Sequence, residues 1–555
     1  MDIRNLSICL LICFINTVQF KISKADVCQI CICSIQEDAT IFVDCHKTKF
    51  SSINIIRFGL ISVEYNRTLA AFDLSENNVT YLPPDMFESS QRLRLINLSN
   101  NLLQEIHGNV FKNLKGLEIL NLSNNKIKTL DSAILPSLKS LDLSNNSISD
   151  LDFQFHKAYP KLTELNLSYN KLDDSINGTL TLLRQLKHLD LSHNNFSLLD
   201  NEDFNVLTNL ISLNLSHNSI KFLTKQKFPE SLIVLNVGFN CLSTFPATNL
   251  SKMKILNIEF NQISEMPTIT NNELCDMKFL NISGNKLVNW PNLKAENLQI
   301  LDLSYNKFSS IPVTLNKENY PTLENLIFDG NLITRIEFPS LLNLHSLIMR
   351  NMTYVESIDR NSFEKLSTSA EKDCLNLTLT DNKKLRYLDA KAFDGLNLCM
   401  LNLKNNQFTY FNPMLSKSGF MRTKFGVDLE GNPLHCNCSL QWMIDDLVPW
   451  LYLINPDLLN NLRCMTPDSV KGKRMVHWYM WKEQVLCNNT RLYSSRMTAE
   501  TLQVLSRNNP ITLQTSNGML IVLVLAVITL LVLVVVGIIY AKKISLRRSR
   551  MNRRF

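Results

Sequence analysis

The sequence predicts an α/β solenoid, a coil of short repeats curved into a horseshoe, with a disulfide cap at each end and one transmembrane helix. Three observations lead to this prediction. A nine-residue pattern, L-x-x-L-x-L-x-x-N, recurs along most of the chain, four cysteines stand at each end of the repeats, and a long uncharged apolar run lies near the C-terminus. One such repeat cannot bury its own apolar face, so neighbouring repeats must stack into a continuous core.

The repeat is clearest in residues 117–125, where Leu117, Leu120 and Leu122 are the apolar positions and Asn125 closes the pattern. This is the core of a leucine-rich repeat, in which a short strand turns three apolar residues inward. The second apolar position recurs sixteen times, mostly at steps of 21 to 25 residues, at Phe72, Ile96, Leu120, Leu141, Leu165, Leu189, Leu213, Leu235, Leu256, Leu280, Leu301, Leu326, Leu347, Leu377, Leu401 and Val427. We assign residues 51–435 to about sixteen repeats.

The asparagine that closes each repeat is predicted to be structural. The first seven are Asn77, Asn101, Asn125, Asn146, Asn170, Asn194 and Asn218. A buried amide without partners costs about 1 to 3 kcal/mol, so these side chains should hydrogen-bond the backbone of adjacent turns. Phe87, Phe111 and Phe204 each follow such an asparagine by ten residues and should form a second apolar spine on the convex side.

This 24-residue form of the repeat resembles extracellular leucine-rich-repeat proteins of the Toll-receptor, Slit and chaoptin kind. The resemblance covers a signal, caps, repeats and a membrane span. It stops at residues 542–555, which are too few to bury a core, so we expect no Toll-type signalling domain after the span.

Residues 1–25 are interpreted as a secretory signal peptide. Arg4 precedes an apolar run at 6–15 that is too short to cross a bilayer, and polar residues follow at 21–24. An uncleaved anchor is the alternative. Secretion places the remaining cysteines in an oxidising environment, where disulfides form and persist.

Two groups of four cysteines bound the repeats, in residues 26–50 and 436–488. Their spacings are C-x2-C-x-C-x11-C and C-x-C-x25-C-x22-C, and both resemble the caps of extracellular leucine-rich-repeat domains. The resemblance implies that the first cysteine pairs with the third and the second with the fourth. The implied pairs are Cys28 with Cys33, Cys31 with Cys45, Cys436 with Cys464 and Cys438 with Cys487. Spacing alone permits three connectivities in each group, and zinc binding is the alternative.

Four further cysteines lie within the repeats, at Cys241, Cys275, Cys374 and Cys399. Cys374 stands three residues before Leu377, whereas Cys399 stands two before Leu401, so the two side chains should face differently. We predict that Cys374 and Cys399 are free, buried thiols. The sequence leaves the state of the other two open.

The C-terminal part predicts membrane attachment. A polar stalk at 489–518 leads to residues 519–541, which carry no charge and span about 34 Å as a helix, enough for a hydrocarbon core of roughly 30 Å. The tail at 542–555 has seven basic residues and no acid, which predicts a cytoplasmic location. We therefore expect a single-pass type I protein of the plasma membrane with an extracellular N-terminus. The tail accounts for the whole net charge of +7, so charge indicates no nucleic-acid partner.

Catalytic and cofactor motifs are missing from the sequence. The nine histidines are scattered, and H-E-x-x-H, Walker, G-x-G-x-x-G and G-x-S-x-G patterns do not occur. We expect no enzymatic activity, no cofactor and no metal site.

The residue between the last two core positions of each repeat should point out of the concave sheet, because strand side chains alternate. From the first repeat onward this row is polar, comprising Asp73, Asn97, Asn121, Asp142, Asn166, Asp190, Asn214, Asn236, Asn257, Asn281 and Asp302. Several members also belong to N-x-S sequons, since the LNLS of the repeat is itself a glycan acceptor. The candidate glycosylation sites are Asn66, Asn78, Asn97, Asn121, Asn145, Asn166, Asn177, Asn195, Asn214, Asn249, Asn281, Asn351, Asn376 and Asn488.

The polar row then ends, because Ile327 and Ile348 take the next outward positions and the following repeat lengthens to 30 residues. Apolar residues exposed on a curved sheet beside a longer loop mark an interaction site. The candidate partner-binding residues are Ile327, Ile348, Arg350 and Tyr354. The alternative is a degenerate repeat whose isoleucines are covered by the insert at 354–373.

Taken together, these features predict a cell-surface protein that binds extracellular or cell-surface proteins as a receptor, co-receptor or adhesion molecule. A short tail implies that a signalling co-receptor would carry any signal inward. An innate-immune receptor for microbial ligands and a homophilic structural adhesion protein are the alternatives, because one solenoid scaffold serves many ligands.

Overall fold

The structure is a computed structural model. It describes residues 27–35, 40–51, 68–88, 90–130, 133–152, 154–198, 204–223, 228–246, 250–267, 274–368, 374–481 and 483–487. All of these except Cys487 belong to one compact unit, Met1–Leu486, and the second unit is Cys487–Phe555. The predicted signal peptide, stalk, membrane span and tail lie outside the described residues. Within the described ranges, the helices are all too short or too polar to cross a bilayer.

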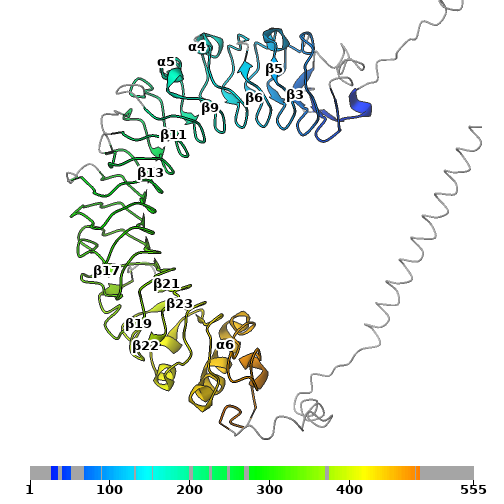
Figure 1. The fold of residues 1–555 in the computed structure, drawn as a ribbon. Coiled ribbons are helices and arrows are strands. Elements are labelled where there is room, and N and C mark those ends of the chain that lie inside the picture. The colour runs from blue at the N-terminus through cyan, green and yellow to red at the C-terminus, as the bar shows by residue number, and fades with distance from the viewer. Residues whose placement is uncertain are drawn as a thin grey trace, which may run out of the picture. The chain divides into compact units, whose positions relative to one another are not determined.

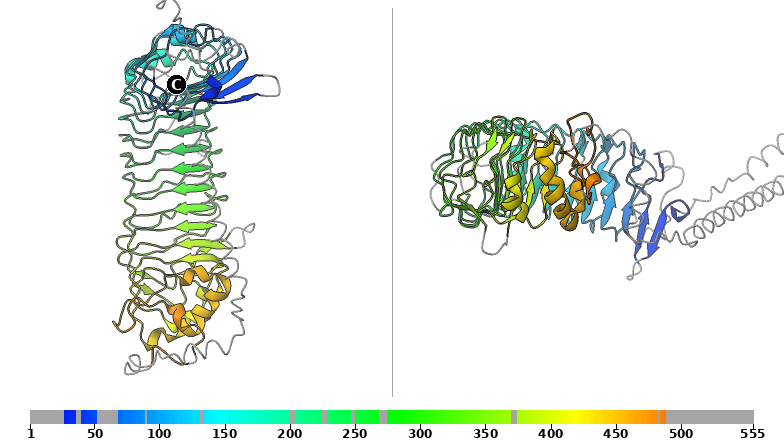
Figure 2. Two further views of the ribbon diagram at one scale, coloured as in Figure 1. Left: turned by 90° about the vertical axis from the view of Figure 1, so that its right-hand side faces the viewer. Right: turned by 90° about the horizontal axis from the view of Figure 1, so that it is seen from below.

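Each repeat of the first unit contributes one short strand, and the strands stack along the inner side of an arc (Figures 1 and 2). The strands of this main sheet are β1 (Ile32–Ile35), β2 (Ile41–Asp44), β3 (Leu69–Asp73), β4 (Leu95–Asn97), β6 (Ile119–Asn121), β8 (Ser140–Asp142), β9 (Glu164–Asn166), β10 (His188–Asp190), β11 (Ser212–Asn214), β12 (Val234–Asn236), β13 (Ile255–Asn257), β14 (Phe279–Asn281), β15 (Ile300–Asp302), β16 (Asn325–Ile327), β18 (Ser346–Ile348), β21 (Leu375–Thr378), β23 (Leu398–Asn402) and β24 (Val427–Asp428).

From β2 to β24 these strands pair in sequence order and in parallel, whereas β1 pairs with β2 as an antiparallel hairpin. All sixteen predicted second positions, from Phe72 to Val427, lie on strands of this sheet and are buried. The predicted frame of the repeat is therefore confirmed.

The outer side of the arc carries less helix than an α/β solenoid implies. Three two-stranded parallel sheets lie there, formed by β5 (Glu105–Ile106) with β7 (Thr129–Leu130), β17 (Leu342–Asn343) with β20 (Leu366–Ser367), and β19 (Ser357–Ile358) with β22 (Tyr387–Leu388) (Figure 1). The helices described are α4 (Phe155–Ala158), α5 (Asn177–Leu180), α6 (Val448–Ile454), the π-helix η7 (Met443–Leu447), and the 3-10 helices η1 (Val27–Gln29), η2 (Gly108–Phe111), η3 (Asp174–Ile176), η4 (Pro413–Lys417), η5 (Gly419–Arg422), η6 (Cys438–Leu440), η8 (Pro456–Leu459) and η9 (Met475–Trp478). A return segment of a 21- to 25-residue repeat is too short for a full helix, so the fold is a β-solenoid-like stack.

A column of asparagines holds each rung to the one before it. The Nδ2 of Asn101 donates to the carbonyl of Leu74 in the preceding rung at 2.9 Å and to Leu98 in its own, while its Oδ1 accepts from the backbone N–H of Val79. The same arrangement recurs down to Asn331, which is fully buried. The prediction that these amides bond adjacent turns is confirmed.

The predicted phenylalanine spine is also present. Phe87, Phe111 and Phe204 are each at most 2% exposed, and the rings of Phe87 and Phe111 lie 6.4 Å apart. These side chains close the core on the side opposite the sheet, so each rung is a thin layer with apolar residues facing inward from both sides.

Disulfides close both ends of the unit. The recorded pairs are Cys28–Cys33, Cys31–Cys45 and Cys436–Cys464, as the resemblance to extracellular caps implies. Cys438 and Cys487 are also disulfide-bonded. The terminal rungs would otherwise expose apolar edges, and the caps cover them.

The prediction of free thiols at Cys374 and Cys399 is wrong, because the structure joins them in a disulfide with the Cα atoms 4.9 Å apart. The prediction assumed an unbroken strand alternation. The pairing of β21 with β23 instead shifts register after Leu375, which makes Cys399 an extra residue in its strand and turns it toward Cys374. Among the described residues, Cys241 and Cys275 are free and half-buried.

We predict that Asn331→Ala lowers stability by about 1 to 3 kcal/mol, because it leaves buried backbone groups of two rungs unpaired. Asn113→Ala, at an exposed asparagine with one long bond to Glu88, is the matched control and should change stability by less than about 0.5 kcal/mol. Thermal unfolding followed by circular dichroism measures both. Equal midpoints for the two variants would contradict the structural role of the column.

Candidate partner-binding surface

The concave sheet presents two outward residues per rung. In β15, for example, Leu301 is buried while Ile300 and Asp302 on either side of it are half-exposed. Most of these strands are three residues long, so their first and third residues form two parallel columns across the rungs. These columns are the surface that a partner entering the arc would meet.

The third-residue column is the predicted polar row, and its members hydrogen-bond one another. Asn97 donates to Asp73 at 2.9 Å and Asn214 to Asp190 at 3.0 Å, while Asn281 donates to Glu259, which lies outside the row, at 3.1 Å. Most of the row is half-exposed, but Asn281 is only 8% exposed. Cross-rung bonds of this kind satisfy the polar groups within the protein, so the row has little remaining need of a partner.

Ile327 and Ile348 are brought together as predicted. They lie directly opposite each other in the pairing of β16 with β18, and both are half-exposed. The described part of the insert does not pair with the main sheet, since β19 and β20 belong to two separate two-stranded sheets. The two isoleucines are therefore accessible on the concave face.

The other two predicted residues have different surroundings. Tyr354 is 46% exposed, and the Nζ of Lys384 lies 5.1 Å from its ring centroid. Arg350 is held by Asp329, whose side chain is 3% exposed, with Nη2 at 2.6 Å and Nε at 2.8 Å from Oδ2. The Arg350 backbone N–H also donates to Oδ1 of this carboxylate.

The Arg350–Asp329 pair is structural as well as exposed. Hydrogen bonding to Asp329 raises the pKa of the Arg350 guanidinium, against the opposing effect of burial. Burial raises the pKa of the neighbouring Asp302, and the charges of Asp329 and Glu259 add to this rise. Arg350 thus neutralises a buried carboxylate, with its outer half left free to contact a partner.

The first-residue column adds apolar residues that the sequence analysis missed. Val234, Ile255, Phe279 and Ile300 stand opposite one another on four consecutive rungs, and Ile255 is 39% exposed. Each of these residues directly precedes the central leucine of its strand, whereas the sequence analysis considered only the residue that follows this leucine. We call Val234, Ile255, Phe279, Ile300, Ile327 and Ile348 the concave stripe.

A smaller apolar hollow of about 530 Å³ lies at the other end of the sheet. Leu95 and Ile119, opposite each other on β4 and β6, line it together with Phe42 and Ala71. Ile119 is 43% exposed. This N-terminal hollow is a second candidate contact surface on the same face.

The sequons fall unevenly over the surface. Asn78, Asn145, Asn195 and Asn351 are exposed, whereas Asn177 and Asn281 are buried. The concave candidates Asn97, Asn121, Asn166 and Asn214 are half-exposed and lie on β4 to β11, and Asn376 on β21 is also half-exposed. Asn66, Asn249 and Asn488 lie outside the described residues. On β12 to β18 the one sequon residue is the buried Asn281, so a glycan would find no exposed attachment point on the concave stripe.

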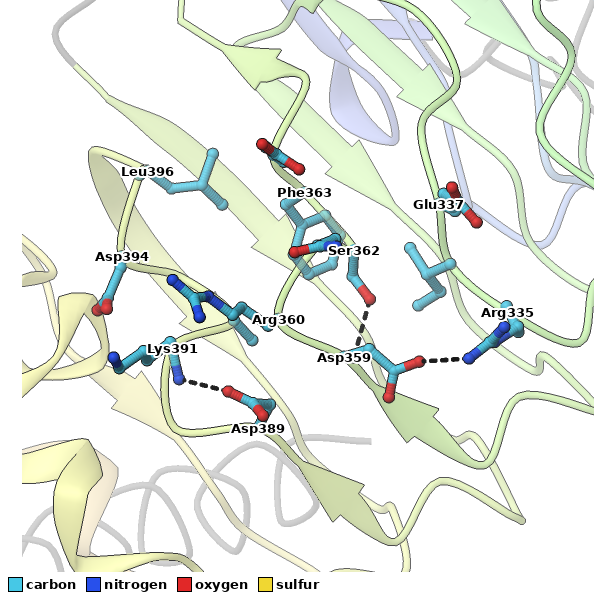
Figure 3. Close-up of a pocket in the computed structure, with 15 residues that line it drawn as sticks. Arg335, Glu337, Asp359, Arg360, Ser362, Phe363, Asp389, Lys391, Asp394 and Leu396 are labelled. Atoms are coloured by element: carbon cyan, nitrogen blue, oxygen red, sulfur yellow. Dashed lines mark hydrogen bonds and ion pairs between the residues drawn. The ribbon is translucent and has the colours of Figure 1, made fainter.

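A cavity of about 880 Å³ on the return segments is lined mainly by charged and polar side chains (Figure 3). Arg335 pairs with Asp359 at 3.4 Å, and the backbone N–H of Lys391 donates to Asp389. Its lining has an excess of acids, with Glu337, Asp359, Glu364, Asp389 and Asp394 against Arg335, Arg360 and Lys391. Among the described residues, no group of three or more histidine, cysteine or acidic side chains could hold a metal ion.

Comparison with known proteins agrees with the fold. The leucine-rich-repeat family models match residues 67–127, 136–196 and 297–317. Leucine-rich repeat-containing protein 3 of the zebrafish, Danio rerio, is 32% identical over 127 residues, which are 22% of this chain and 42% of that protein, so the chain spans less than half of that relative.

Solved structures with a similar fold share little sequence with this chain. A leucine-rich-repeat protein of Leptospira interrogans is 21% identical, covering 72% of this chain and 90% of that one, with a TM-score of 0.44. The structure of the Toll–Spätzle complex of Drosophila is 19% identical, covering 74% and 70%, with a TM-score of 0.41.

We predict that Arg350→Met lowers stability by about 1 to 3 kcal/mol, because Asp329 is left as a buried carboxylate without its cation. Arg335→Met, which breaks an ion pair between exposed side chains, is the control and should cost less than about 1 kcal/mol. Chemical denaturation followed by tryptophan fluorescence compares the two. If Arg350→Met unfolds no earlier than Arg335→Met, the pair has no structural role.

Proposed function

We propose that this chain, whose repeats and fold are those of leucine-rich-repeat proteins, acts at the cell surface, where its extracellular solenoid binds other proteins as a receptor, co-receptor or adhesion molecule. The repeats form a scaffold whose function lies in the side chains it displays. The sequence features that support the location are the predicted signal peptide at 1–25, the predicted span at 519–541 and the basic tail.

The concave stripe is the observation that carries this proposal. It consists of two runs on the inner face of the arc. Val234, Ile255, Phe279 and Ile300 occupy the first-residue column from β12 to β15, and Ile327 and Ile348 occupy the third-residue column on β16 and β18, with Asp302 opposite Ile327. Exposed apolar residues bordered by polar groups are typical of a protein-binding site. The polar rim here is the row of Asn236, Asn257 and Asp302, together with Arg350.

The chemistry of the stripe favours a protein over a small molecule. The concave face curves around a broad partner, and its apolar residues are spread over many rungs instead of gathering in a deep pocket. A partner with an aliphatic or aromatic centre would exclude water from Ile327 and Ile348, and its polar margin would meet the asparagines and Asp302.

We predict that Ile327→Asp with Ile348→Asp abolishes partner capture on living cells. Two carboxylates at the centre of an apolar contact would have to be desolvated without a counter-charge, which costs more than such a contact gains. The measurement is proximity labelling from the full-length protein, with the labelled protein set of the double variant compared with that of the wild type. Surface abundance and thermal stability of the variant should remain unchanged, since both side chains face outward.

Leu95→Asp with Ile119→Asp is the matched control, because this pair also lies opposite on neighbouring rungs of the same face. Its labelled set should match that of the wild type. Loss of partner capture in this control variant alone would move the site to the N-terminal hollow. An unchanged set of labelled proteins in both variants would refute a concave site.

Mixing non-adherent cells that express the protein distinguishes a homophilic adhesion protein from a receptor for other proteins. Clumping of the cells indicates homophilic adhesion, and no clumping indicates a receptor.

A further inference from the structure

An exposed apolar surface lies on the C-terminal cap, at the end of the arc that contains α6 (Figure 1). Leu453 is 81% exposed and Met480 is 79% exposed, the highest values among the large apolar side chains that the structure describes. Trp481 at 50%, Phe425 at 49% and Tyr452 at 46% complete the set. We call these five residues the cap patch.

Contacts between the segments that carry these residues make the cap patch one surface. The ring of Tyr452 in α6 stacks on the ring of Tyr479, with centroids 4.5 Å apart, and two members of the patch follow Tyr479 directly in the chain. Asn455, just after the same helix, donates to the backbone carbonyl of Phe425 at 3.4 Å. The patch therefore joins the entry to β24, the exposed side of α6 and the segment after η9.

The core of the cap does not account for these apolar side chains. In α6 the buried residues are Val448 and Leu451, so Leu453 lies outside the face that packs on the protein. Met480 has φ of 67°, the left-handed region, which a residue with a large side chain rarely adopts. An unfavourable backbone conformation that holds an apolar side chain out in solvent points to a contact outside the chain.

The chain that follows the patch leads to a membrane. The last cysteine of the cap is Cys487, and the predicted span begins at residue 519. The segment between them, 488–518, would reach at most about 110 Å even if it were fully extended. Such a tether keeps the patch near the lipid surface, so that even a weak contact with lipid would form. Because this step uses the predicted span, the inference rests on the proposed location at the cell surface.

The composition of the patch fits the interface of a bilayer. Trp and Tyr side chains sit at the level of the lipid headgroups, where their rings meet apolar chains and their N–H and O–H groups meet water. Residues 436–488 carry no net charge, with five basic and five acidic side chains, namely Arg463, Lys471, Lys473, Arg474 and Lys482 against Asp445, Asp446, Asp457, Asp468 and Glu483. Zwitterionic phospholipid is therefore the lipid surface that this cap matches, since a neutral cap is not attracted to an anionic one.

We propose that the cap patch rests on the extracellular surface of the membrane that holds the predicted span, with Leu453, Met480 and Trp481 inserted among zwitterionic phospholipids. These side chains would enter the boundary between headgroups and acyl chains by about 5 to 10 Å, the depth of other interfacial segments. The cap patch is separate from the concave stripe, which lies on β12 to β18.

The test uses the full-length protein in phosphatidylcholine vesicles whose acyl chains carry bromine near the headgroup, because bromine quenches tryptophan fluorescence at short range. Trp481 is the exposed tryptophan, since Trp290, Trp442 and Trp478 are buried, Trp450 is half-buried and the predicted span contains none. The emission lost in Trp481→Phe measures the contribution of Trp481. Brominated lipid should reduce that contribution about twofold or more relative to ordinary lipid, because a Trp at headgroup level lies within reach of the bromine.

Leu453→Asp with Met480→Asp should abolish this quenching, because two carboxylates cannot enter the lipid without a large desolvation cost. The variant should fold normally, since both side chains are exposed. Leu198→Asp with Leu341→Asp, at exposed apolar residues of other rungs, is the matched control and should be quenched as the wild type is. Quenching should persist when salt is raised to about 0.5 M, since the contact is apolar.

Unquenched Trp481 in the wild type would overturn the proposal, as would equal quenching in the Leu453→Asp, Met480→Asp variant or loss of quenching at high salt. A wild-type oligomer that this variant dissociates would also overturn it, since a second copy would then cover the patch. Vesicle flotation and antibody staining of intact cells measure the proposed location separately. Protein that does not float with the vesicles refutes the span, whereas protein that floats without quenching refutes only the contact of the patch with lipid.

Discussion

The buried asparagine amide at the end of each strand is the interaction on which this structure depends. It bonds carbonyl groups of its own rung and of the rung before, so it fixes both the turn and the spacing between repeats. If only the burial of leucines held the rungs together, neighbouring rungs could slide past one another, because apolar contacts are not directional. Directional bonds at nearly every rung, with Met352 as the exception, hold the stack of apolar layers in one register. That register places side chains from distant parts of the sequence side by side on the surface.

The same constraint aligns two sets of surface side chains. Because the register between strands is fixed, the first residues of successive strands lie in line. This alignment makes the concave stripe continuous from Val234 to Ile300. It also lines up the residue before each asparagine, which brings the rings of Tyr169, His193, His217, Phe239 and Phe260 to stacking distance and forms an aromatic ladder. Neither surface follows from one repeat considered alone. Both arise because each repeat position recurs at the same place on neighbouring rungs, as in other quasi-one-dimensional proteins.

The predictable part of the molecule is the part set by local pattern. The strand positions follow from leucine spacing, and the asparagine bonds follow from the cost of an unpaired buried amide. Ile327 and Ile348 could be found because they interrupt a polar column. The Cys374–Cys399 disulfide could not be predicted, because it depends on a register shift that no pattern in the sequence indicates. The ion pair of Arg350 was missed because its partner, Asp329, lies 21 residues earlier, on the preceding rung. The aromatic ladder was detectable in principle by comparing the residue before each asparagine across repeats.

The Cys374–Cys399 disulfide has a mechanical consequence. A solenoid whose rungs contact only their neighbours unravels from its ends when it is pulled, one rung after another. This disulfide links β21 to β23 across the irregular register, next to the lengthened repeat in which Met352 occupies the position of the missing asparagine. A force that pulls on the C-terminal side would first detach β24 and then β23 as far as Cys399. Further extension would require cleavage of the covalent Cys374–Cys399 bond, which is far stronger than the contacts between rungs. The 24 residues between the two cysteines could not be drawn out, because the load would pass through the bond directly to Cys374.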